Sequence, residues 1–138
     1  MSAAVPSSQS TAAAMPADPA SLADRYLAAW NETDPARRRE LIALAWTESA
    51  SYVDPLMRGD GHAGIDAMIA AVQGRFPGFR FTRVSPVDAH GEHLRFTWEL
   101  GPASEPALVV GTDFATVGAD GRLARMTGFI DRAPAGLA

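Results

Sequence analysis

The chain has 138 residues, a formal net charge of −4 and no cysteine. This length predicts one domain, and the lack of cysteine excludes disulfides and cysteine-bound zinc and favours a cytoplasmic location. All twelve basic residues are Arg, and a single basic cluster, Arg37-Arg38-Arg39, in a mildly acidic chain predicts a solvated helix face and no nucleic-acid partner.

The first 19 residues consist almost entirely of Ala, Ser, Pro, Thr and Gln, with no charged side chain before Asp18. This composition predicts a disordered tail. We expect the domain to occupy residues 20–132, followed by a short C-terminal tail at 133–138. The start lacks the features of a secretory signal, and no apolar run is long enough to cross a membrane, so no membrane partner is predicted.

Two helices are predicted to begin at Asp-Pro pairs, in which the aspartate caps the helix and the proline takes its first position. The first helix follows Asp18-Pro19 and runs to about Asn31. Its apolar stripe is Leu22, Tyr26, Ala29 and Trp30. The second helix follows Asp34-Pro35 and turns its arginines outward. Its expected inward residues are Leu41, Ile42, Leu44, Ala45 and Trp46.

A short strand is expected at residues 50–54, where Pro55 ends it and a glycine-rich loop at 58–61 follows. The third helix is predicted from His62 to Arg75. Its apolar face is Ile65, Met68, Ile69 and Val72. From Phe79 the hydrophobic period changes to two, which predicts four strands at 79–88, 94–100, 107–117 and 123–131. This order indicates an α+β fold in which a curved, mostly antiparallel sheet wraps the helices and leaves a hollow at one end.

Two aspartates interrupt strand-like apolar sequence. Asp54 closes the run Ala50–Val53, and Asp113 lies within the run 107–115. A carboxylate in such a place is paired, kept neutral by a raised pKa, or turned out to water. Tyr26 points inward from the first helix, and a buried tyrosine needs a hydrogen-bond partner for its hydroxyl group.

Three segments of the chain resemble the nuclear transport factor 2-like (NTF2-like) superfamily, which includes SnoaL-like polyketide cyclases and ketosteroid isomerase. They are Arg25–Ala29, Val53-Asp54-Pro55 and the stretch from Asp113 to Met126. The resemblance covers about residues 20–132 and implies a cone-shaped α+β barrel that dimerises through the outer face of its sheet. Tyr26, Asp54 and Asp113 fall on the positions of the isomerase site.

The resemblance implies that Asp54 is a base and that Tyr26 and a protonated Asp113 donate hydrogen bonds to an oxygen that gains charge. Further residues are expected to line the pocket, although core packing explains several of them equally well. They are Tyr52, Trp30, Trp98, Met126, Ile130 and His62. For His62, the alternative is a solvated helix start.

We predict no cofactor and no metal, because His90 and His93 lack a third ligand at suitable spacing. The sequence thus favours binding of a small, mostly apolar molecule that bears a carbonyl or hydroxyl group, with proton transfer of the isomerase or cyclase type by Asp54. The alternative is a ligand-binding or dimeric assembly module without turnover. A third reading is water addition or epoxide opening, with a water held by Asp54, Asp113 and Tyr52.

Overall fold

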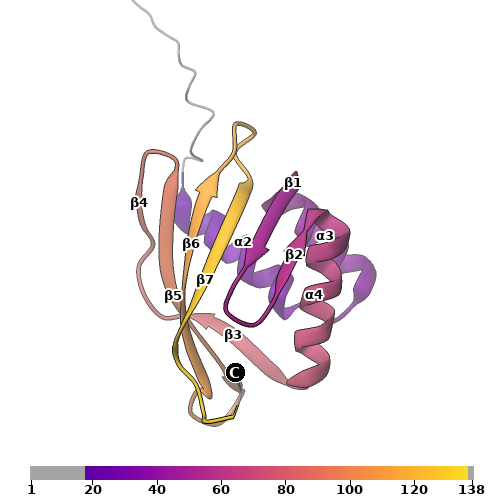
Figure 1. The fold of residues 1–138 in the computed structure, drawn as a ribbon, viewed down its shortest axis with the longest axis vertical. Helices are drawn as coiled ribbons and strands as arrows, with labels where there is room; N and C mark the ends of the chain where they lie inside the picture. Colours follow the sequence, from indigo (N-terminus) through magenta and orange to yellow (C-terminus); the bar gives the residue numbers. More distant parts are fainter. Residues whose placement is uncertain (1–17, 137–138) are drawn as a thin grey trace, which may run out of the picture.

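Three helices pack against a strongly curled sheet in the computed structural model, which describes residues 18–136 (Figure 1). The helices are α2 (Pro19–Asn31), α3 (Pro35–Ala45) and α4 (Gly61–Arg75). The strands are β1 (Trp46–Val53), β2 (Arg58–Asp60), β3 (Phe79–Arg83), β4 (Asp88–His90), β5 (His93–Pro102), β6 (Val109–Val117) and β7 (Leu123–Arg132). The predicted α+β class and the cone-shaped architecture are confirmed.

The seven strands form one mixed sheet in the order β2-β1-β7-β6-β5-β3, with β4 paired to β5. Strand β1 runs parallel to β7, and the other pairs are antiparallel. In Figure 1, α2 crosses behind β6 and β7, while α4 lies beside β1 and β2. The helices therefore cover the concave face of the sheet, and the side chains of that face form the core.

The two predicted helix starts are confirmed. The Asp18 carboxylate accepts a hydrogen bond from the amide of Ala20, and the Asp34 carboxylate accepts one from the amide of Arg37. In both helices proline follows the cap. The capped starts fix where α2 and α3 begin, because each satisfies an amide that has no partner within the helix.

Three boundaries differ from the prediction. Trp46 begins β1 instead of ending the second helix, so this strand is longer than residues 50–54. Residues 58–60, expected in a loop, form β2 because they pair with β1. The strand expected at 79–88 is divided into β3 and β4 by a segment that contains Pro86, a residue without the amide hydrogen that a sheet ladder needs.

The prediction of an outward arginine face on the second helix is wrong for Arg38, and Leu44, expected inside, is exposed. The Arg38 Nε donates to Asp66 Oδ1 on α4 at 2.6 Å. Its Nη1 donates to Gln73 Oε1 and to the carbonyl oxygen of Glu32. The helical spacing of residues within α3 cannot reveal these contacts, because the partners of Arg38 come from α4 and from the end of α2.

The predicted N-terminal tail falls largely outside the described residues, since α2 begins at Pro19 and residues 1–17 are not described. The predicted C-terminal tail is described up to residue 136. None of the described helices is long and apolar enough to span a membrane.

Replacing Arg38 by alanine is expected to lower the free energy of unfolding by about 3 kcal/mol, because it leaves Asp66 partly buried without its counter-charge. The matched control is Arg37→Ala, which removes an exposed arginine from the same helix and should change stability by less than about 0.5 kcal/mol. Urea unfolding of both variants measures the difference. Equal effects would show that the buried pair is not what ties α3 to α4.

Candidate functional site

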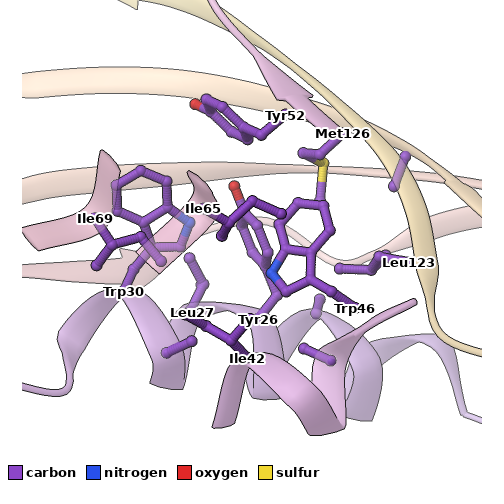
Figure 2. Packing of buried hydrophobic residues seen from close by; sticks show 14 of the residues in the cluster. Tyr26, Leu27, Trp30, Ile42, Trp46, Tyr52, Ile65, Ile69, Leu123 and Met126 are labelled. Carbon is purple, nitrogen blue, oxygen red and sulfur yellow. The ribbon is translucent and has the colours of Figure 1, made fainter. Parts of the chain in front are cut away.

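Two tyrosine–aspartate pairs meet between the helices and the sheet. The Tyr26 hydroxyl donates to Asp113 Oδ2 at 2.7 Å, and the Tyr52 hydroxyl donates to Asp54 Oδ2 at 2.7 Å. Tyr26 comes from α2, Tyr52 from β1 and Asp113 from the middle of β6, while Asp54 follows the end of β1. Figure 2 shows Tyr26 between Trp30 and Trp46, with Tyr52 above them, and the Tyr52 ring centroid lies 5.6 Å from that of Trp30.

Gly128 on β7 lies where these two pairs come together. It is the register partner of Asp113 on β6. A Cβ at this position would lie 2.9 Å from the Tyr52 hydroxyl oxygen, 3.0 Å from Asp113 Oδ1 and 3.1 Å from the Asp54 Cβ. Both acids therefore face one small space, which any larger residue at 128 would fill.

Asp54 is held by its own loop as well as by Tyr52. Its Oδ1 accepts hydrogen bonds from the amides of Leu56 at 2.8 Å and Met57 at 3.0 Å. These bonds orient the carboxylate, which is half-buried. A carboxylate offers about four lone-pair sites and three are occupied here, so Oδ2 keeps one site for a ligand.

Asp113 is 2 % exposed, and burial raises its pKa to about 6. The hydrogen bond from the Tyr26 hydroxyl and the nearby indole N–H of Trp98 oppose this rise, and the nearby charge of Asp54 adds to it. Burial, together with the neighbouring carboxylates, raises the pKa of Tyr26 and of Tyr52 well above the ordinary value. Both phenols therefore remain protonated donors, whereas Asp113 can change its charge near neutral pH.

A cavity of about 180 Å³ opens from this site. Its inner wall is aromatic: the Phe81 ring centroid lies 5.1 Å from that of Trp30 and 5.4 Å from that of Trp98. The wall also includes exposed residues, among them Leu56 and Arg75, which mark its mouth. The cavity is thus apolar along its sides, with its two carboxylates beside Tyr26 and Tyr52.

Most of the residues predicted for the site do line this cavity. They are Tyr26, Trp30, Tyr52, Asp54, Trp98, Asp113 and Ile130. Met126 and His62 do not: Met126 is fully buried in the core, and His62 places its Nε2 3.0 Å from the carbonyl oxygen of Trp46. Met126 pairs with Ala115 on β6, two residues before Gly128 on its own strand, and its side chain belongs to the buried core.

Other lining residues were not predicted from the sequence. They are Leu27, Leu56, Met57, Ala71, Val72, Arg75, Phe76, Phe81, Leu100 and Val109. Phe81 had a usable signal, since it stands in the period-two stretch that starts at Phe79. Leu56 and Met57 had none, because only the folded loop brings them to the mouth. Within residues 18–136, no three His, Cys, Asp or Glu side chains gather as a metal site would require.

The model of the SnoaL-like domain family matches residues 23–126. No curated protein matches the chain. A solved structure from Agrobacterium tumefaciens, proposed to be an isomerase of the SnoaL-like family, is 44 % identical with a TM-score of 0.79, over 82 % of this chain and 97 % of that one. A proposed ketosteroid isomerase from Kribbella flavida is 25 % identical with a TM-score of 0.61, over 86 % of this chain and 81 % of that one. A proposed polyketide cyclase from Sinorhizobium meliloti shares the fold, with a TM-score of 0.62. It is 16 % identical, over 78 % of this chain and 93 % of that one.

The raised pKa of Asp113 predicts a specific pH dependence of stability. The folded protein holds this proton up to about pH 6, whereas in the unfolded chain the carboxyl has its ordinary pKa of 3.8. Rising pH therefore removes stability until it passes the folded-state pKa. The isosteric Asp113→Asn variant stays neutral, so its stability relative to the native protein should rise by about 2 kcal/mol between pH 4.5 and pH 7.5.

Urea unfolding of both proteins at the two pH values measures this change. A difference between the proteins that does not depend on pH would contradict a raised pKa at Asp113.

Proposed function

The chain belongs to the SnoaL-like domain family, and from this we propose that its cavity binds a compact, mostly apolar molecule bearing a carbonyl or hydroxyl group and transfers a proton on it. The observation that carries the proposal is the buried Tyr26–Asp113 pair, which faces Asp54 across the space left by Gly128. Burying a carboxylate costs stability unless hydrogen bonds or a counter-charge compensate it. Carboxyl groups with perturbed pKa values therefore cluster at functional sites.

The size of the cavity supports a small ligand. A cavity of about 150 Å³ holds benzene, whereas pockets for drug-sized ligands have about 300–1,000 Å³. The cavity of about 180 Å³ therefore suits a molecule of one or two rings. The aromatic wall of Trp30, Phe81 and Trp98 favours a flat ring system, since aromatic rings stack against it.

In the proposed reaction Asp54 is the base. Its Oδ2 takes a proton from the carbon next to a carbonyl group, the C–H electron pair forms a C=C bond, and the carbonyl π pair moves to oxygen. Asp113, when protonated, donates a hydrogen bond to that oxygen. In a β,γ-unsaturated ketone the enolate is conjugated with the second C=C bond. Asp54 then returns the proton to the far carbon of that bond while the electron pair on oxygen re-forms the carbonyl group, so that atoms and charge balance and no co-reactant is needed.

The similarity to the Agrobacterium tumefaciens protein supports an isomerase-type reaction, because that protein is itself proposed to be an isomerase and 97 % of it is covered. The alternative is a binding or assembly module of the same family, which keeps the cavity and has no turnover. The two functions differ in what they require of Asp54. Catalysis needs its carboxylate to accept a proton, whereas binding needs only its shape and charge.

We expect the native protein to accelerate hydrogen–deuterium exchange next to the carbonyl group of a compact ring ketone such as 2-tetralone, measured by NMR in deuterated buffer. The Asp54→Asn variant should lose this acceleration by about a hundredfold or more, because it removes the proton acceptor. Circular dichroism and ligand binding control for the fold. A ketone that binds without faster exchange in the native protein would leave the binding module as the function.

We further propose that two copies of the chain associate through the outer face of the sheet, as the resemblance implies. Phe114 on β6 is 40 % exposed and Phe129 on β7 is 53 % exposed. Their register partners, Thr127 and Thr112, lie between them on the same face. Two large aromatic side chains on one exposed sheet face suit a self-complementary contact.

The Phe129→Arg variant is expected to shift the protein from dimer to monomer in sedimentation-velocity experiments, because it places a charge in the contact. Leu44→Arg is the matched control, since Leu44 on α3 is equally exposed (54 %) and lies away from the sheet. A native protein that is monomeric at all concentrations, or a dimer that survives Phe129→Arg, would contradict this interface.

A further inference from the structure

Several buried polar atoms of the described chain make no hydrogen bond to another described residue. They are Trp30 Nε1, Trp46 Nε1, His93 Nδ1, Trp98 Nε1 and Asp113 Oδ1. Buried polar groups are nearly always paired, so each exception calls for an explanation. Trp30, Trp98 and Asp113 all line the cavity and are more than nine-tenths buried. Trp98 and Asp113 stand out because they are a donor and an acceptor on the neighbouring strands β5 and β6, whereas Trp30 comes from α2.

Gly111 determines where the Trp98 indole lies. It is the register partner of Trp98 on β6, and a Cβ at this position would be 2.2 Å from Trp98 Cζ2 and 2.6 Å from Cε2. The indole therefore lies directly over the glycine, two residues before Asp113. The indole N–H is close enough to favour the ionised form of Asp113, yet it makes no hydrogen bond of ordinary geometry to it.

Tyr26 is less available to a ligand. A phenol has one donor hydrogen, and that of Tyr26 is directed to Asp113 Oδ2 at 2.7 Å. Tyr52 is engaged in the same way with Asp54. The donor of Trp98 and the acceptor Oδ1 of Asp113 are thus a complementary pair on neighbouring strands of the cavity wall that intramolecular hydrogen bonds leave unused.

We propose that Trp98 Nε1 and Asp113 Oδ1 together bind the hydroxyl group of an enol, phenol or alcohol, with Trp98 as the donor to the ligand oxygen. A hydroxyl group both accepts and donates, so it satisfies both atoms at once. An apolar ring without this group leaves both atoms desolvated and unpaired, which is costly. The proposal rests on the proposed function and narrows its ligand class to compact ring compounds with a hydroxyl or enolisable oxygen.

Tyr26 then becomes a positioning residue, which holds Asp113 through Oδ2 and so leaves Oδ1 directed to the ligand. Trp98 assumes the role that the resemblance assigned to Tyr26. During proton transfer by Asp54, the indole N–H is a fixed dipole that stabilises the charge on the ligand oxygen without a change in its own protonation.

The test compares phenol with toluene, which has nearly the same shape and lacks the hydroxyl group. The chain has three tryptophans, so a ¹⁵N-labelled sample gives three indole N–H signals. Phenol should move the Trp98 signal downfield in a saturable way and leave the Trp46 signal in place, because Trp46 does not line the cavity. Trp98→Phe should weaken phenol binding by about tenfold and change toluene binding by less than about twofold.

Trp46→Phe is the matched control, since it removes another buried, unpaired indole N–H and should leave the affinity for phenol unchanged. Equal affinity for phenol and toluene, or phenol binding without a shift of the Trp98 signal, would overturn this assignment and leave the proposed cavity function standing. Failure of both compounds to bind the folded protein would overturn the proposed function together with it.

Discussion

The hydrogen bond between Tyr26 and Asp113 is the constraint on which the rest of the site depends. A carboxylate in the middle of a buried strand loses its hydration, and without a donor it would destabilise the sheet. Tyr26 supplies this donor from α2, which requires α2 to cross the concave face at that strand. The same contact therefore fixes the position of the helix and keeps one carboxylate oxygen facing the cavity.

Two glycines give this arrangement the space that it needs. Gly111 makes room for the Trp98 ring, and Gly128 leaves open the gap among Tyr52, Asp54 and Asp113. Both stand on the concave face, opposite large or charged register partners on the neighbouring strand. In a closely packed core, missing side chains would normally leave costly voids. Here they form a cavity because aromatic rings line it on one side and the mouth loop orients Asp54 on the other.

The sequence allowed prediction of those features that depend on local periodicity. The stripe of α2 placed Tyr26 inside, and alternation along β6 placed Asp113 on the buried face. Features that depend on contacts between distant elements could not be predicted from the sequence. The Arg38–Asp66 pair joins two helices, β1 begins early because β7 pairs with it, and His62 turns back to the Trp46 carbonyl. In each of these cases tertiary contacts override the local pattern.

The two carboxylates of the cavity lie in different environments. Asp113 has aromatic and aliphatic neighbours and one phenol donor, so its proton is retained up to about pH 6. Asp54 accepts hydrogen bonds from two backbone amides and one phenol, and it lies beside the mouth loop. The proposed reaction uses this difference, with Asp113 as the hydrogen-bond donor and Asp54 as the base. Since the amides belong to the mouth loop, the conformation of this loop and the orientation of the Asp54 carboxylate are linked, and a ligand that displaces Leu56 or Met57 would alter both.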